Sequence, residues 1–169
     1  MSMSLPVLPE RFNFAEHLIS LNAERGDQPA FIDDSQVLSY RELTSSVRRF
    51  ADALLRLGLM PEQRILVFLN DCIEWPVAFL GAMYAGLVPV PLNTLLPEVD
   101  VAYMLEHSGA CAAVIGYSLL STFEKACKLT EQHHECVKIV VASNGDPQTG
   151  SPLRSCWHRP RGAANRLRR

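Results

Sequence analysis

The uncharged stretch at residues 78–93 changes its hydrophobic pattern midway. Apolar residues recur at helical spacing up to Gly86, a residue that suits a helix C-terminus because glycine accepts a positive φ. Residues 87–92 then have the composition of a strand, and Pro89 and Pro91 remove two N–H groups from the same lateral edge. The stretch therefore predicts a helix that runs into a short strand or an edge strand.

The same pattern has a second interpretation. Residues 75–92 form an uncharged run near the length that a membrane-spanning helix requires. Two prolines in close succession, Pro89 and Pro91, would free several backbone groups in lipid with no neighbouring span to satisfy them. We therefore expect a buried α/β core and no membrane span.

Shorter patterns precede this stretch. An amphipathic helix is predicted over residues 14–22, and it ends before a stop signal at Gly26. Two apolar runs, 30–33 and 37–39, are separated by turn-forming residues and predict a hairpin. The apolar positions of the amphipathic helix are Phe14, Leu18, Ile19 and Leu21.

A long helix is predicted directly after the hairpin. Ser39 and Glu42 have the spacing of a capping box, in which each side chain accepts from the other residue's backbone N–H. Residues 43–57 keep one apolar face and one charged face, and Gly58 supplies a C-terminal stop.

Helices and strands alternate from there to residue 142. A continuous apolar run at 64–69 is typical of a strand covered on both faces. The start of the next helix stays open between Asp71 and Pro76. Further elements are a helix with Pro97 in its first turn and a stop at Gly109, a strand at 111–115, a helix at 119–129 and a strand at 137–142. This alternation predicts an α/β fold, with a parallel sheet in α/β/α layers.

Bulk properties agree with one soluble domain. The chain has 169 residues, of which 48% are hydrophobic and 20% charged, an ordinary balance for a globular protein. Its first residues lack the pattern of a secretory signal. Five irregularly spaced cysteines fit a reducing compartment better than a disulfide framework. We therefore expect a cytoplasmic protein.

Charge divides the chain unevenly. All 18 acidic residues precede Ser151, whereas 6 of the 16 basic residues follow Gly150. We divide the chain into a lead-in at 1–10, an α/β domain at 11–142, a turn-rich loop at 143–150 and a basic tail at 151–169. The abrupt change favours a tail translated out of frame or a truncated chain; a solvated tail and an arm that contacts nucleic acid remain alternatives.

Residue chemistry identifies no active site. No G-x-G-x-x-G follows a strand, and no G-x-x-x-x-G-K-[ST] phosphate loop occurs. The cluster at 133–136 offers possible metal ligands but lacks a C-x-x-C partner. Several single residues favour structural roles over catalytic ones: His17, His107, His133, His134, Glu135, Cys136, Cys72 and Cys111. We predict no catalytic, cofactor-binding or metal-binding residue in this chain.

Two stretches together resemble the adenylate-forming (AMP-binding) superfamily. They are Leu-Ser-Tyr-Arg-Glu-Leu at residues 38–43 and Phe-Leu-Gly-Ala-Met-Tyr-Ala-Gly-Leu-Val-Pro-Val-Pro-Leu-Asn at 79–93. Their order and separation also match, over about residues 11–142 of the chain. Within the acyl-CoA synthetase branch, segments at 12–18, 75–80, 93–96 and 103–108 resemble benzoate-CoA ligase.

The resemblance implies an enzyme that activates a carboxylic acid with ATP to an acyl-adenylate and passes the acyl group to coenzyme A. It implies ATP, magnesium and coenzyme A as cofactors of the intact enzyme and an aromatic acid as its substrate. The family's phosphate-binding loop, later motifs and C-terminal lysine have no counterpart here. Some relatives place an arginine for coenzyme A where this chain has Leu95, two residues after Asn93.

We therefore expect an N-terminal fragment of a benzoate-CoA ligase-like enzyme, comprising an incomplete portion of its large domain and inactive alone. Within this portion Tyr40 and Glu42 open a helix, and the segment from Gly86 to Asn93 forms a helix–strand junction. The alternative is a non-catalytic binding module whose Arg-rich tail contacts nucleic acid.

Overall fold

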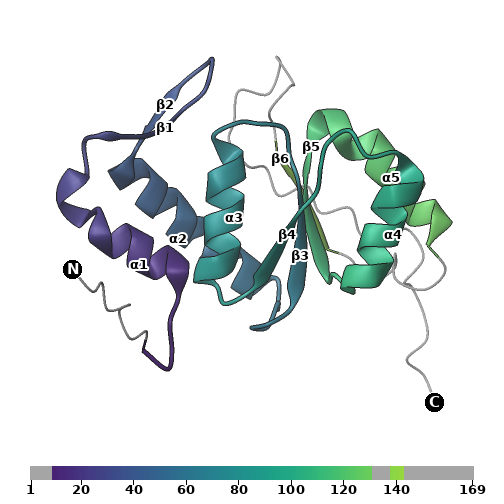
Figure 1. The fold of residues 1–169 in the computed structure, drawn as a ribbon, viewed down its shortest axis with the longest axis horizontal. Helices are drawn as coiled ribbons and strands as arrows, with labels where there is room; N and C mark the ends of the chain where they lie inside the picture. Colours follow the sequence, from purple (N-terminus) through teal and green to yellow (C-terminus); the bar gives the residue numbers. More distant parts are fainter. Residues whose placement is uncertain (1–8, 131–137, 143–169) are drawn as a thin grey trace, which may run out of the picture.

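A four-stranded parallel sheet lies between two layers of helices (Figure 1). The structure is a computed structural model that describes residues 9–130 and 138–142. Its elements are α1 (Phe14–Leu21), β1 (Pro29–Ile32), β2 (Val37–Ser39), α2 (Tyr40–Arg56), β3 (Arg64–Phe68), α3 (Glu74–Tyr84), β4 (Val88–Pro91), α4 (Glu98–Ser108), β5 (Ala112–Gly116), α5 (Leu120–Leu129) and β6 (Lys138–Ala142), with short 3-10 helices at Ala23–Arg25 and Tyr117–Leu119.

The order of the strands in the sheet is β4-β3-β5-β6. All three neighbouring pairs are parallel, with Leu66 opposite Val90 on one side and Ala113 on the other. β1 and β2 form a separate antiparallel hairpin, as the two apolar runs before the long helix predict. The parallel sheet expected from the alternation of helices and strands is confirmed.

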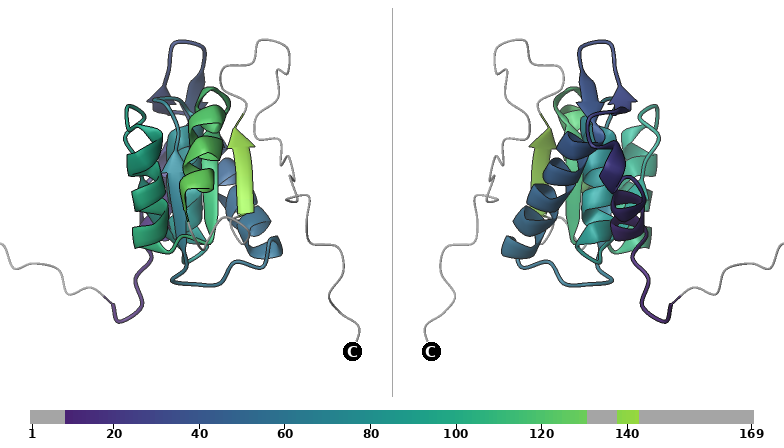
Figure 2. Two further views of the ribbon diagram at one scale, coloured as in Figure 1. Left: turned by 90° about the vertical axis from the view of Figure 1, so that its right-hand side faces the viewer. Right: turned by 90° about the vertical axis from the view of Figure 1, so that its left-hand side faces the viewer.

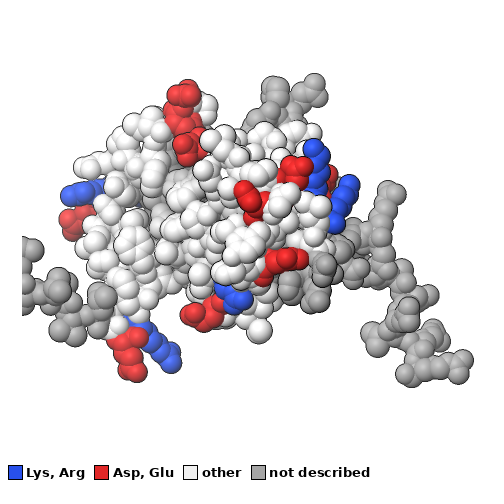
Figure 3. Space-filling model, turned by 45° about the vertical axis from the view of Figure 1, so that its right-hand side comes forward, with Lys and Arg blue, Asp and Glu red and all other residues white. Residues whose placement is uncertain are grey.

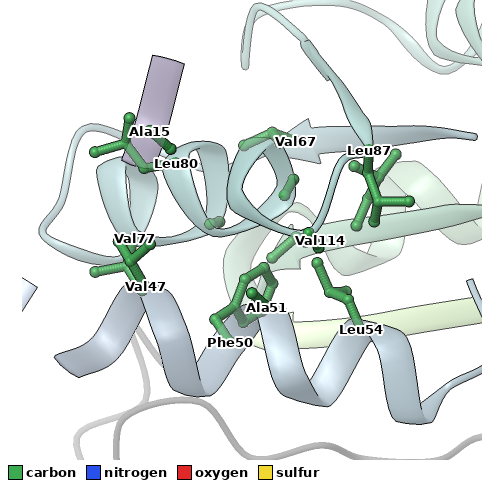
Figure 4. Close-up of a cluster of buried hydrophobic side chains, with 14 of the residues drawn as sticks. Ala15, Val47, Phe50, Ala51, Leu54, Val67, Val77, Leu80, Leu87 and Val114 are labelled. Carbon is green, nitrogen blue, oxygen red and sulfur yellow. The ribbon is translucent and has the colours of Figure 1, made fainter. Parts of the chain in front are cut away.

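The sheet separates two hydrophobic clusters. In β3, Ile65 and Val67 face the layer of α2 and α3, whereas Leu66 and Phe68 face α4 and α5. The close-up in Figure 4 shows α2 and α3 meeting on the first side, where Phe50 and Leu54 of α2 are buried. Helix α1 packs on the outside of α3 and inserts Ala15 into the same cluster. Both faces of β3 are therefore covered, which explains its continuous apolar sequence.

β4 lies at one edge of the sheet, as its prolines predict. Val88 N–H donates to the carbonyl of Gln63, and Leu92 N–H donates to the carbonyl of Val67, both at 3.0 Å. Alternate residues of a strand point their backbone N–H groups to opposite sides. The backbone nitrogens of Pro89 and Pro91 therefore face the side of β4 away from β3. The missing donors thus interrupt no hydrogen bond within the sheet.

Several boundaries differ from the sequence predictions by a residue or so; β1 and β3, for example, end at Ile32 and Phe68, one residue before the predicted 33 and 69. Helix α3 begins at Glu74, between the two starts that the sequence leaves open. Pro97 is the N-cap of α4, one position before the first turn, and its extended φ and ψ of −69° and 162° keep it outside the helix. The predicted strand at 111–115 begins instead at Ala112, because the chain is still leaving the turn after α4 at Cys111.

The apolar face of α1 was assigned incorrectly. Its buried residues are Ala15 and Ile19, with Leu18 partly buried beside them. Phe14 and Leu21 are 50% and 69% exposed, because the helix turns a narrow stripe toward α3. A short helix that packs mainly against one neighbouring helix needs few buried positions.

Several predictions fall outside the described residues. These are the lead-in up to residue 8, the cluster at 133–136, the turn-rich loop and the basic tail. Within the part of the chain that the structure describes, no helix combines the length and the apolar character that crossing a membrane requires.

Candidate functional site

The carboxyl end of the parallel sheet is the natural place for a site in this fold. Figure 2 shows the hairpin at the same end of the molecule as the arrowhead of β6. The helix after β3, α3, covers one face of the sheet, whereas the helix after the neighbouring strand β5, α5, covers the other face. Open α/β sheets bind ligands at such a reversal, outside the carboxyl ends of the strands.

A pair of polar side chains marks this reversal. Asn70 follows β3, and its Nδ2 donates a hydrogen bond to Oγ of Ser118 beyond β5, at 3.0 Å. Both side chains are exposed. Sequence reasoning did not single out this pair, although a polar residue two positions after each buried strand was a usable signal.

The turn after β4 contains Leu95, the position where the family resemblance leads us to expect an arginine in some relatives. Asn93 Oδ1 accepts a hydrogen bond from the N–H of Leu95 at 3.0 Å, so its side chain closes the turn. Leu95 is 87% exposed and contributes no cation. Asn93 thus fixes the backbone of the turn at the carboxyl end of β4, and Leu95 provides no guanidinium that could pair with a phosphate.

A cavity of about 410 Å³ lies between the hairpin and the β3–α3 loop. Asp33 connects its two walls. Oδ1 accepts from the N–H and hydroxyl of Ser35 at 2.8 and 2.7 Å and from Gln36 N–H at 2.9 Å, while Oδ2 accepts from Ile73 N–H at 3.2 Å. These donors, Ser35 above all, lower the pKa of Asp33 from 3.8 to about 2. Asp33 is therefore an ionised structural link between the hairpin and α3.

The three cysteines within the described residues are positioned as packed thiols. Burial, followed by the charge of Glu74 and a hydrogen bond to it, raises the pKa of Cys72 to about 11. Burial and the charge of Glu124 raise the pKa of Cys127 to about 11 as well. Cys111 is partly buried against the cluster beneath α2 and α3. Thiols with raised pKa values are mostly protonated at neutral pH and react slowly as nucleophiles.

The two described histidines lie on helices next to aromatic rings. His17 packs against Phe12 with ring centroids 5.2 Å apart. His107 stacks on Tyr103 at 5.3 Å in the last turn of α4, where a cation interacts favourably with the helix dipole. The structure does not bring either histidine together with the Asn70–Ser118 pair in any recorded contact. His133 and His134 lie outside the described residues.

The described residues do not fit a magnesium–ATP site by themselves. Residues 9–130 and 138–142 contain no group of three His, Cys, Asp or Glu side chains that could hold a metal ion. Asp33 is occupied by four hydrogen bonds, and Asn93 closes its own turn. We derive no chemical step through ATP or magnesium from this part of the chain.

Charge on the described surface is mixed. On the face drawn in Figure 3, Lys and Arg side chains are few and are interspersed with Asp and Glu. The one ion pair recorded in the described part joins Arg41 and Asp27 at 2.9 Å, and both side chains are largely exposed. The described residues on this face thus form no basic patch of the kind that neutralises nucleic acid phosphates.

Three comparisons with known proteins point in the same direction. A sequence profile described as AMP-binding enzyme matches residues 20–161. The benzoate–CoA ligase of Thauera aromatica is 45% identical over 119 residues, which cover 69% of this chain and 23% of the relative. The 4-hydroxybenzoate–CoA/benzoate–CoA ligase of Rhodopseudomonas palustris is 38% identical over 117 residues, covering 68% and 22%.

The solved structures agree with the sequence matches. A benzoate CoA ligase from Burkholderia xenovorans LB400 superposes with a TM-score of 0.74 at 43% identity, covering 79% of this chain and 26% of that protein. The α/β fold class expected from the sequence is confirmed. The chain spans about a quarter of the length of these relatives.

Proposed function

Because the chain belongs to the AMP-binding enzyme family, we propose that it is the N-terminal part of an AMP-forming ligase that joins an aromatic carboxylic acid to coenzyme A. The observation that carries the proposal is the 45% identity to a benzoate–CoA ligase over 119 residues. The fold match to a second benzoate CoA ligase, at 43% identity, also supports it. The match to about a quarter of each relative supports the view that this chain supplies one portion of the large domain.

In this proposal the chain supplies a scaffold. ATP, magnesium and coenzyme A act in the intact enzyme, where the transition state at phosphorus requires donors and a metal ion. The residues described here hold the carboxyl ends of β3, β4 and β5 in register and set the turns that follow them. Groups from the rest of the enzyme complete the site, so we propose that the chain alone is inactive.

Benzoate-dependent exchange of pyrophosphate into ATP tests the proposal. We expect no exchange from the purified chain of 169 residues. A chimera that joins residues 1–142 to the remaining segment of the Thauera aromatica relative is expected to restore exchange. Exchange by the chain alone would overturn the proposed inactivity, and a folded chimera that activates only unrelated acids would overturn the proposed substrate class.

The boundary of the basic tail stays a prediction. The family profile extends to residue 161, which lies inside the tail as we divide the chain. Translation of the coding DNA in all three frames beyond Gly150 tests the out-of-frame interpretation directly. A Ser/Thr/Gly-rich loop ending in Pro-Lys in another frame supports it. Absence of such a loop from every frame favours a genuine short protein.

The alternative of a nucleic-acid-binding module rests on the arginines after Gly150. Binding of this kind weakens steeply with salt, because neutralised phosphates release counterions. We expect no duplex DNA binding at low salt. Salt-sensitive binding that disappears on deletion of residues 151–169 would favour the alternative.

We further propose a cytoplasmic location, which fractionation of cells expressing a tagged chain would test.

A further inference from the structure

A groove runs between β2, α2 and α3, beside the hairpin. Its volume is about 700 Å³, within the range of small-molecule sites in proteins. Phe50, Ile73 and Val77 provide an apolar wall, and Glu74 and Arg49 are among its polar residues. We call this cavity the α2–α3 groove. It is separate from the Asn70–Ser118 pair and was not found by sequence reasoning.

Glu74 is the unusual member of the groove. Its side chain is only 9% exposed, although it carries a carboxylate and is the first residue of α3. The side chain recorded in contact with it is the thiol of Cys72, which is a weak donor. An ionised carboxylate accepts up to about four hydrogen bonds, and buried charges are normally paired with an opposite charge. Within the described residues no ion pair to Glu74 is recorded.

The other charged residues of the groove are already engaged. Glu42 Oε2 accepts from the N–H and hydroxyl of Ser39 at 2.9 and 2.7 Å. Arg49 is exposed and donates to Oγ of Ser46 on its own helix at 3.2 Å. Glu74 is thus the group in the groove whose demand for a partner is least satisfied.

We propose that the α2–α3 groove binds a small organic amine, with its ammonium group at Glu74 and its apolar body along Phe50, Ile73 and Val77. Glu74 is the first residue of α3, where the positive end of the helix dipole lowers the cost of burying a carboxylate. A protonated amine adds the charge partner, and its apolar body removes the exposed part of the wall from water. The proposal does not depend on the proposed ligase activity.

An anionic ligand is the competing possibility, since Arg49 also lines the groove. A carboxylate placed there would approach Glu74, and like charges in a poorly solvated site repel each other. Arg49 is solvent-exposed, so its attraction for an anion is weaker than the interaction at the buried Glu74. The geometry therefore favours the cation.

Three probes of one length separate these possibilities: octylamine, octanol and octanoate. Binding to the full 169-residue chain is measured by isothermal titration calorimetry at pH 7, where the amine is protonated. We expect octylamine to bind at least about tenfold more tightly than octanol, which corresponds to about 1.4 kcal/mol. Equal affinities, or tighter binding of octanoate, would overturn the proposal.

Glu74→Gln removes the charge and keeps the shape, so we expect it to abolish the preference for octylamine over octanol. Glu98→Gln is the matched control, because Glu98 is also the first residue of an 11-residue helix, α4, but does not line the groove. It is expected to bind like the unmodified chain. Retention of the preference in Glu74→Gln, or its loss in Glu98→Gln, contradicts the proposal.

Two further variants test the location without disturbing the core. Ala53 is exposed and lines the groove, so Ala53→Phe is expected to fill it and weaken binding of both octylamine and octanol. Arg49→Gln removes a nearby positive charge and is expected to strengthen octylamine binding. Unchanged binding in a folded Ala53→Phe chain, checked by circular dichroism, places the amine elsewhere and overturns the proposal.

Discussion

Helices α2 and α3 pack against each other, but the residues that fix their N-terminal ends differ. Those of α2 are close to its start in the sequence, whereas the one for α3 is far from it. Ser39 caps α2 through Glu42, three residues away, and both halves of the capping box are formed. Helix α3 has no side-chain cap of its own at Ile73. Instead, Asp33 accepts the N–H of Ile73 from 40 residues away. One start is local in sequence, and the other depends on the fold.

Burial follows the same division. Helix α2 buries one face, with Leu43, Val47, Phe50, Ala51 and Leu54 turned inward and charged residues outward. Helix α3 buries seven of its 11 residues, because α1, α2 and the sheet surround it. We infer that α2 can form early from its own signals, whereas α3 requires its neighbours. The following predictions test this contrast, from the largest expected effect to the smallest.

Phe50→Ala is expected to produce the largest loss, because Phe50 joins the two helices and is 5% exposed. Removal of a buried aromatic ring costs about 3–5 kcal/mol of the free energy of unfolding. Urea denaturation followed by circular dichroism measures it. Leu55→Ala on the same helix, at a residue 46% exposed, is the control and should stay within about 0.5 kcal/mol. Equal losses would contradict the packing described here.

Gly81→Ala tests how closely the two helices approach. A Cβ at Gly81 would lie 2.7 Å from Cδ1 of Phe50 and 3.2 Å from the carbonyl oxygen of Val47. Overpacking of this kind costs about 1–3 kcal/mol in the same urea experiment. Gly26→Ala is the control, since Gly26 has a right-handed helical φ of −48° and faces only the flexible end of Arg41. Partial rescue of Gly81→Ala by Phe50→Leu would confirm the contact.

Ser39→Ala removes the local cap of α2 and is expected to cost about 1 kcal/mol. The same substitution in a peptide of residues 38–58 should lower its helical circular dichroism signal. A peptide of residues 72–87, which contains α3, should show little helical signal because it lacks the neighbours that α3 packs against. Strong helicity in the α3 peptide would contradict the division between local and long-range starts.

The pH dependence of the Asp33 link should be the smallest effect. Its folded pKa of about 2 lies below the ordinary 3.8, so ionised Asp33 stabilises the fold above about pH 4. This contribution is lost as the pH falls from about 4 toward 2. An NMR titration of the carboxyl group, with hydrogen exchange at the Ile73 amide, measures it. Asp33 titrating at 3.8 would show that the link to α3 is absent.

The same contrast explains what the sequence could predict. Gly58, Gly86 and Gly109 were predicted as helix stops because each follows a periodic helix, and the positive φ predicted for Gly86 is 78° in the structure. β3 was predicted because a strand covered on both faces reads as a continuous apolar run. The start of α3 was not resolved, because the group that fixes it lies on the hairpin 40 residues earlier.

The candidate site was harder to predict for the same reason. Asn70 and Ser118 are 48 residues apart and meet only because β3 and β5 are neighbours in the sheet. The α2–α3 groove combines residues from three elements, and Glu74 reads in the sequence as an ordinary first-turn acidic residue. Its burial depends on packing, which no local pattern encodes.

Pro89 and Pro91 have a further consequence for how copies of the chain behave at high concentration. A strand from a second molecule that approached β4 would find carbonyl acceptors at these two positions but no donors. Intermolecular strand exchange and fibril growth need both partners of each hydrogen bond along an edge. The outer edge of β4 is therefore a poor template for self-assembly.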